Sequence, residues 1–302
     1  MKKFYNITAI CTVIAAITTN CRAQQPDSAI LRMMPDMPRE ITEPAGRAGY
    51  LALHYWDRYN FRDTAFLMKD DFLERSFVDY LEILSLIPAD ATEKSVNTLM
   101  KKAEDDRQTF LFILKIGEKY HYEATSPMCD EEKFIPFMRY AMQTSLLEDI
   151  EKIRPRFLLE SVLTNRKGDM ANDFVYTLTN GETGNLHSIE ADYTLLYFSD
   201  PGCDICLALT KRLIVSPLIN DLISQGKLKI LTVYTGDEVD LWKQHKPEVL
   251  NSWLYSRDAE QKINMEGLYN IKRFPTIYLL DKEKKVLLKD TALGEIENHF
   301  GK

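Results

Sequence analysis

Apolar side chains in the first half of the chain recur at the three- to four-residue spacing of amphipathic helices. Leu51, Tyr55 and Trp56 share one helical face. Pro88 and Pro127 punctuate the pattern, as expected between helices. We therefore predict a small all-α domain of five or six helices over residues 46–164. Its apolar runs cover residues 72–84, 96–100, 110–116, 134–153 and 156–163.

The pattern changes near residue 165 to short runs that are rich in β-branched and aromatic residues. Three helical runs are predicted between and after them, and Pro217 should break the first of these helices. The order of elements predicts an α/β domain over residues 165–302, with a mixed central sheet flanked by helices. Strands are expected at 174–178, 186–189, 193–198, 228–234, 276–280 and 286–289, and helices at 206–224, 238–245 and 295–300.

The first 23 residues have the pattern of a signal peptide. Lys2 and Lys3 precede a short apolar stretch, and Ala23 offers a small residue at the cleavage point. The apolar stretch is too short to span a bilayer comfortably. In an alternative interpretation, Cys21 is the lipidated first residue of a lipoprotein, although the residues before it match that pattern poorly. We expect export to the periplasm, membrane contact only if Cys21 is lipidated, and a polar tether over residues 24–45.

Charge and cysteine usage narrow the functional classes. The formal net charge is −7 and no basic block stands out, so we expect no nucleic-acid partner. Three of the five cysteines follow the predicted signal peptide: Cys129, Cys203 and Cys206. One close pair and one single cysteine suit a reactive dithiol with a bystander better than a disulfide framework.

The pair Cys203 and Cys206 follows a predicted buried strand and opens a predicted helix. Unsatisfied N–H groups and the positive end of the helix dipole meet at such a position, and both favour a thiolate. The thiolate is the nucleophile of disulfide exchange. We expect Cys203 to attack and Cys206, one turn further into the helix, to resolve the mixed disulfide.

Two further uses of a C-x-x-C pair were considered. A zinc site needs two more ligands, and no second such pair or suitably spaced histidines are present, so we expect no metal. A peroxide-reducing cysteine would need Thr or Ser three residues earlier, where this chain has Asp200.

Residues 165–302 resemble the thioredoxin-like superfamily, and in particular its TlpA-like thiol–disulfide oxidoreductases. The resemblance rests on the C-x-x-C pair after a strand, on Phe274-Pro275-Thr276 at the head of the last hairpin, and on the lead-in from Gly168 to Phe174. It implies that Pro275 is cis and that Phe274, Pro275 and Thr276 bind substrate. By the same resemblance, the active-site loop comprises Pro201, Gly202, Asp204 and Ile205.

The chain departs from the family pattern where proton transfer is expected. The buried acid that thioredoxins carry six residues before the first cysteine is replaced by Tyr197. A second acid, found in some TlpA-like reductases, is replaced by Leu209. Resolution of the mixed disulfide is therefore expected to be slower or to use water.

The helical half is similar to a domain of unknown function that precedes such modules in exported bacterial proteins. His54-Tyr55-Trp56-Asp57, Glu118-Lys119-Tyr120 and Ser126-Pro127-Met128 carry this similarity, which implies no activity.

Together these patterns predict a cell-envelope thiol–disulfide oxidoreductase, working as a reductase or an isomerase. Its redox centre would be the Cys203–Cys206 disulfide, with no other cofactor. Its partners would be protein thiols and disulfides and a membrane electron donor. The alternatives are a thioredoxin-fold scaffold that binds a partner with weak or no catalysis, and a peroxide reductase.

Overall fold

The computed structural model describes residues 33–246 and 252–301. The chain divides into two compact units between Leu159 and Glu160. The predicted signal peptide over residues 1–23, including Cys21, lies outside the described residues.

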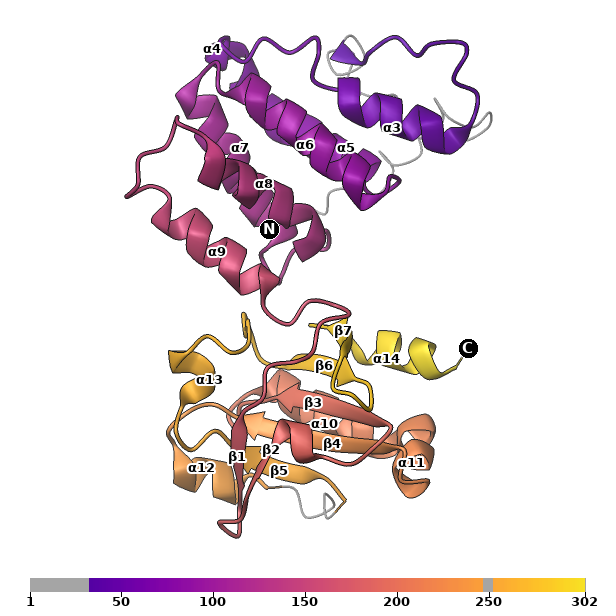
Figure 1. The fold of residues 1–302 in the computed structure, drawn as a ribbon, viewed down its shortest axis with the longest axis vertical. Coiled ribbons are helices and arrows are strands. Elements are labelled where there is room, and N and C mark those ends of the chain that lie inside the picture. Colours follow the sequence, from indigo (N-terminus) through magenta and orange to yellow (C-terminus); the bar gives the residue numbers. More distant parts are fainter. Residues whose placement is uncertain (1–32, 247–251, 302) are drawn as a thin grey trace. The chain divides into compact units, whose positions relative to one another are not determined.

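The N-terminal unit is helical in its described part (Figure 1). Side chains at the helix ends explain several of the boundaries. Pro88 occupies the N-cap of α6, and the carboxylates of Asp106 and Asp130 accept backbone N–H groups at the starts of α7 and α8. The elements are α3 (Pro44–His54), α4 (Thr64–Leu67), the 3₁₀ helix η2 (Lys69–Asp71), α5 (Phe72–Leu84), α6 (Ala89–Ala103), α7 (Arg107–His121), α8 (Glu131–Gln143) and α9 (Ile153–Leu163).

The helix expected over residues 134–153 was predicted too long. Helix α8 ends at Gln143, and the backbone of Thr144 is extended. The Thr144 hydroxyl accepts the N–H of Leu146 at 3.1 Å and donates to Glu104 at 2.5 Å. A threonine that bonds its own local backbone competes with the helix, which explains the early end.

Aromatic side chains and a chain of buried hydroxyls hold the helices together. Tyr55 and Trp56, which we placed on one helical face, are each 1% exposed. Tyr80 of α5 hydrogen-bonds the Ser95 hydroxyl of α6 at 2.7 Å, and Ser95 donates to the Ala52 carbonyl of α3 at 2.7 Å. These buried polar atoms satisfy one another, so they link three helices without a desolvation penalty.

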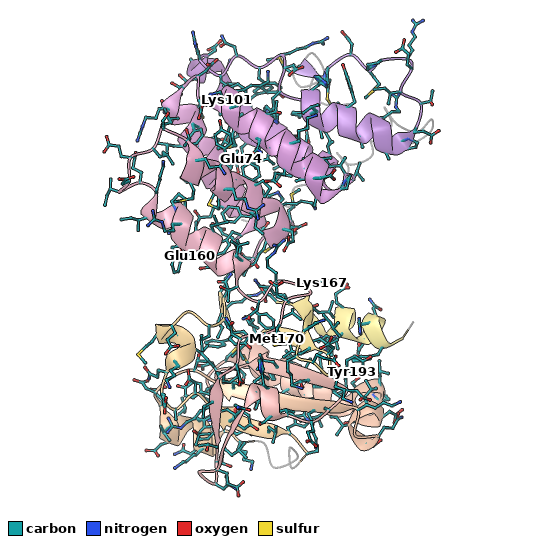
Figure 2. The ribbon with its side chains drawn as sticks, in the orientation of Figure 1. Glu74, Lys101, Glu160, Lys167, Met170 and Tyr193 are labelled. Atoms are coloured by element: carbon teal, nitrogen blue, oxygen red, sulfur yellow. The ribbon has the colours of Figure 1, made fainter. Side chains whose placement is uncertain are left out.

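Polar contacts also join more distant parts of the unit. Glu74 of α5, labelled in Figure 2, accepts a hydrogen bond from the Tyr120 hydroxyl of α7 at 2.8 Å and pairs with Lys119. Met34 and Asp36 lie in the segment before α3 that we predicted as a tether. Arg58, which follows α3, donates to the Met34 carbonyl at 2.8 Å and to the Asp36 carboxylate at 2.5 Å. This part of the segment is therefore held by the helical unit.

The C-terminal unit is built on a seven-stranded mixed sheet in the order β2-β1-β5-β4-β3-β6-β7 (Figure 1). The central strand β3 runs parallel to β4 and antiparallel to β6. The strands are β1 (Val175–Leu178), β2 (Thr183–Asn185), β3 (Tyr193–Phe198), β4 (Leu228–Tyr234), β5 (Leu254–Arg257), β6 (Thr276–Leu280) and β7 (Val286–Lys289). The helices are α10 (Asp204–Val215), α11 (Pro217–Ser224), α12 (Val239–Gln244), α13 (Lys262–Met265) and α14 (Leu293–Phe300), with a 3₁₀ turn η3 (Leu186–Ser188).

Alternation along β3 gives the sheet two separate apolar faces. Leu195 and Tyr197 point to the face covered by α10, α11 and α14, whereas Leu196 and Phe198 point to the face covered by the lead-in and α13. Tyr193, at the start of β3 and labelled in Figure 2, packs edge-on against Phe300 of α14 with 4.9 Å between ring centroids.

The sequence-based element list needs three corrections in this unit. Residues 186–189 form a 3₁₀ turn rather than a strand, because the Asn185 carboxamide caps the Ser188 N–H at 2.8 Å. The second strand lies earlier, at Thr183–Asn185. Strand β5 and helix α13 were not predicted, whereas the break of the long helix at Pro217 is confirmed.

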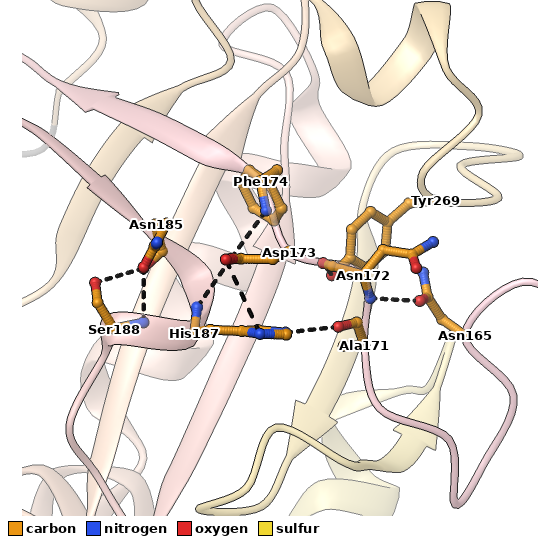
Figure 3. A network of polar contacts seen from close by, with 9 residues as sticks. All are labelled: Asn165, Ala171, Asn172, Asp173, Phe174, Asn185, His187, Ser188 and Tyr269. Carbon is orange, nitrogen blue, oxygen red and sulfur yellow. Dashed lines mark hydrogen bonds and ion pairs between the residues drawn. The ribbon is translucent and has the colours of Figure 1, made fainter.

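A polar network fastens the lead-in to the sheet (Figure 3). Asn165 accepts the Asn172 N–H at 2.8 Å, and the Tyr269 hydroxyl donates to the Asn172 carbonyl at 2.6 Å. Asp173 accepts the N–H of His187 at 3.0 Å, and the His187 ring bonds the Ala171 carbonyl at 2.7 Å. Residues 168–171 also make backbone hydrogen bonds of 2.8 Å to Val286, the first residue of β7, and of 2.9 Å to Lys284 in the turn before it.

Candidate active site

The dithiol sits where the central strand ends and α10 begins. Cys203 is the N-cap residue of α10, and its sulfur accepts the N–H of Cys206 at 3.1 Å. The turn before it is held by Asp200, whose carboxylate accepts the Gly202 N–H at 2.8 Å and whose carbonyl accepts the Cys203 N–H at 3.1 Å. A backbone amide and the helix N-terminus therefore surround the Cys203 sulfur with groups that favour negative charge on it.

The two cysteines differ in access. Both are free thiols with sulfur atoms 2.6 Å apart, but Cys203 is half-buried and Cys206 is 3% exposed. Burial, followed by the hydrogen bond to Cys203, raises the pKa of Cys206 to about 12. A substrate can reach the first sulfur, whereas the second needs a way to release its proton before it can react.

The head of β6 faces the dithiol. The carbonyl oxygen of Phe274 lies 3.8 Å from the Cys203 sulfur, and the Phe274–Pro275 peptide bond is cis. Phe274 and Pro275 are half-buried. Thr276 is fully buried, and its hydroxyl donates to the Arg273 carbonyl at 2.7 Å. The side chain of Thr276 is therefore turned away from solvent, and the predicted substrate-binding role of this residue stays a prediction.

The predicted active-site loop lies around the accessible sulfur. Pro201 is half-buried, and Gly202, Asp204 and Ile205 are exposed. The Ile205 side chain is 67% exposed, which places an apolar surface next to Cys203.

Tyr197 fills the position where thioredoxins carry an acid. Its hydroxyl donates to the Cys206 carbonyl at 2.8 Å and lies 3.1 Å from the Thr210 hydroxyl. Burial raises the pKa of Tyr197 well above its ordinary value, so the phenol stays protonated near neutral pH. Tyr197 holds the first turn of α10 in place and does not act as a base.

A small cavity of about 50 Å³ lies beneath the dithiol. The strand register explains part of its wall: Tyr197 pairs with Thr232 of β4, and Thr232 pairs with Tyr255 of β5, so the three side chains form a row. Thr210 stands one helical turn after Cys206. The full lining is Tyr197, Ser199, Asp200, Pro201, Cys203, Cys206, Leu207, Thr210, Thr232, His245 and Tyr255.

Our sequence reasoning missed Thr210, Thr232, Tyr255 and His245. The i, i+4 spacing of Cys206 and Thr210 would have shown that these two residues share a helix face. The other three residues come together only through strand pairing and the position of α12, which leave no local signal.

Metal and membrane features were also searched in the described part of the chain. Within residues 33–246 and 252–301, no three His, Cys, Asp or Glu side chains gather as a metal site requires. In the same residues no helix combines the length and apolar character needed to cross a membrane.

The N-terminal half of the chain matches a known protein family. Residues 15–165 match a family model described as a domain of unknown function, DUF5106. No protein with a curated description matches.

Solved structures similar to the chain include three from Bacteroides species. A thioredoxin-like protein from Bacteroides caccae is 36% identical, with a TM-score of 0.84 over 89% of this chain and 97% of that one. The C-terminal domain of an uncharacterized protein from Bacteroides fragilis is 40% identical over 46% of this chain and 99% of that one, with a TM-score of 0.45. The thioredoxin domain of a thiol-disulfide oxidoreductase from Bacteroides vulgatus is 22% identical over 45% of this chain and 98% of that one, with a TM-score of 0.39.

The identity and coverage of the Bacteroides caccae structure, together with the strand–dithiol–helix geometry, confirm the resemblance noted from the sequence. The chain belongs to the thioredoxin-like proteins and carries a DUF5106 domain ahead of its thioredoxin-like unit.

Proposed function

We propose that the C-terminal unit is a thiol–disulfide oxidoreductase of the cell envelope, with Cys203 as nucleophile and Cys206 as resolving thiol. The observation that carries the proposal is the pair itself. A reachable sulfur at a helix N-terminus lies 2.6 Å from a buried one and 3.8 Å from the Phe274 carbonyl.

The cycle follows from these positions. The Cys203 thiolate attacks one sulfur of a substrate disulfide, a new S–S bond forms, and the other substrate sulfur leaves as a thiolate. The Cys206 thiolate then attacks the Cys203 sulfur and releases the second substrate thiolate. The pair ends as the Cys203–Cys206 disulfide, which a membrane electron donor would reduce again. An extended substrate segment would bond the backbone of Phe274 beside the dithiol.

Substrate trapping tests the proposal. Cys206→Ser should accumulate mixed disulfides on Cys203, because attack is intact and resolution is removed. Mass spectrometry of adducts isolated from the envelope would identify the substrates. Cys203→Ser is the matched control and should trap nothing.

A second candidate is a scaffold that binds a partner with little catalysis, and the replacement of the buried acid by Tyr197 favours it. Under that function Cys206→Ser would form no adducts, and Cys203→Ser would leave the biological role intact. Peroxide reduction is a third, weaker candidate; peroxide consumption by the purified protein would favour it.

A further inference from the structure

Resolution by Cys206 requires a group that accepts the proton of its thiol. A thiol whose pKa is raised to about 12 by burial must lose its proton before it attacks the mixed disulfide. The two tyrosines that line the cavity beneath it cannot take that proton. The Tyr197 hydroxyl donates to the Cys206 carbonyl at 2.8 Å, and the Tyr255 hydroxyl donates to the Trp242 carbonyl at 3.0 Å.

The cavity beneath the dithiol supplies a route. Its volume of about 50 Å³ is enough for one or two water molecules, and the hydroxyl-bearing residues Ser199, Thr210 and Thr232 are part of its lining. The cavity touches the buried Cys206 on one side and the exposed His245 on another. Water in such a polar space can pass a proton between groups that do not touch.

The backbone of α12 orients the imidazole ring of His245. His245 Nδ1 lies 2.9 Å from the Leu241 carbonyl oxygen. A carbonyl only accepts, so Nδ1 carries a hydrogen, and in the neutral imidazole Nε2 is then the nitrogen with the free lone pair. Imidazole is also the side chain best matched to proton transfer near neutral pH.

We propose that His245 accepts the proton of Cys206 through water in this cavity, and so supplies the base that Tyr197 does not. The inference rests on the proposed function. In the step, the Cys206 proton passes through water to His245 Nε2. The Cys206 electron pair forms the bond to the Cys203 sulfur, the bond from Cys203 to the substrate breaks, and the substrate leaves as a thiolate that takes a proton from the imidazolium or from water.

Asp200 is the competing acceptor among the groups that face Cys206. The other titratable groups lining the cavity are Tyr197, Cys203 and Tyr255. One oxygen of the Asp200 carboxylate already accepts the Gly202 N–H at 2.8 Å, which fixes that side chain in the loop turn. Lys246, next in the chain, has its ammonium 3.4 Å from the Thr179 hydroxyl.

Stopped-flow reaction of the reduced full-length protein with 5,5′-dithiobis(2-nitrobenzoate) separates the two steps. Attack by Cys203 releases the first thionitrobenzoate, and resolution by Cys206 releases the second. Cys203→Ser/Cys206→Ser protein reports the signal of the remaining thiols. His245→Gln should leave the first phase unchanged and slow the second about 100-fold, the lower end of what a positioned base contributes.

Two further readouts separate proton transfer from a structural effect. The second phase of His245→Gln should keep rising with pH through the alkaline range, where the wild type has levelled off. Added imidazole should accelerate the second phase of His245→Ala. The control His299→Gln, on α14, should match the wild type.

Each outcome has a distinct meaning. A second phase in His245→Gln with wild-type rate and pH profile overturns the role of His245. Slowing by Asp200→Asn alone also overturns it, in favour of Asp200. Loss of the first phase in the wild type would instead contradict the proposed function itself.

Discussion

Two cysteines three residues apart occupy different environments because a helix begins between them. Cys203 is outside the first turn and half-buried, whereas Cys206 is inside it and packs against the sheet. One turn of helix therefore separates the two sulfur atoms. In the proposed cycle, this placement sets the order in which they react, because the two side chains are chemically identical.

Alkylation should reflect that difference. At pH 7.5 iodoacetamide should modify Cys203 in the native reduced protein and leave Cys206 largely unmodified, because Cys206 is 3% exposed and burial raises its pKa to about 12. Labelling of Cys206 should increase as the pH approaches that value. Peptide mass spectrometry measures both sites, and unfolded protein serves as the control in which both react. Equal labelling of the two native sites would contradict the structure.

Tyr197→Phe tests the residue in the acid position. The substitution removes the hydroxyl that donates to the Cys206 carbonyl at 2.8 Å and contacts Thr210 at 3.1 Å. A buried carbonyl without its donor costs about 1–3 kcal/mol, so the free energy of unfolding in urea should fall by that order. If Tyr197→Phe is as stable as the wild type, the hydroxyl does not hold the first turn of α10.

At the scale of elements, the sequence predicted those whose signals are local. Residues 193–198 read as a buried strand because all six residues suit the centre of a sheet, and Pro217 fixed the break between α10 and α11. Strand β5 (Leu254–Arg257) has only four residues, half of them polar, and exists because β4 and β1 pair with it. His245 lies at the site because of the position of α12 in the fold, which no local sequence pattern indicates.

Helix α5 should make the helical unit sensitive to pH. Burial raises the pKa of Asp79 to about 6, and burial together with Asp79 raises the pKa of Glu82 to about 7. Folded pKa values above the unfolded ones mean that the unfolded chain releases these protons first. The contribution of protonated Asp79 and Glu82 to the free energy of unfolding is complete below about pH 4, and it is lost as the pH rises towards 7.

Asp79→Asn should remove much of this dependence. We expect it to raise the free energy of unfolding at pH 8 by about 2 kcal/mol relative to the wild type, with little effect near pH 4. Urea unfolding of the full chain at both pH values measures the change. Asp90→Asn, on the exposed start of α6, is the matched control and should have little effect at either pH. A gain of equal size at both pH values would contradict a titration effect.

At the scale of the whole molecule, the chain contains two cores that are built differently. The helical unit packs around aromatic side chains such as Trp56, whereas the other unit packs both faces of a sheet around residues such as Leu196. The two compact units correspond to a matched domain of unknown function and a thioredoxin-like module.

Separate cores predict separate responses to core damage. Trp56→Ala should destabilise the helical unit by about 3–5 kcal/mol, because it leaves a cavity among buried rings. Hydrogen exchange should accelerate in α3, α5 and α6 and stay unchanged in β3, β4 and β6. Leu196→Ala should give the converse pattern. Faster exchange across both units after either substitution would indicate one cooperative core.

The backbone bonds between residues 168–171 and β7 have a consequence for solubility. An uncovered edge strand offers a row of free amides and carbonyls to any other chain, which is a route to aggregation. Here the lead-in occupies that row beside Lys284 and Val286, and the opposite edge is the three-residue strand β2. Neither border of the sheet offers a long template, so we expect little strand-to-strand association of the protein at high concentration. Removing residues 165–171 would uncover one border and should favour self-association.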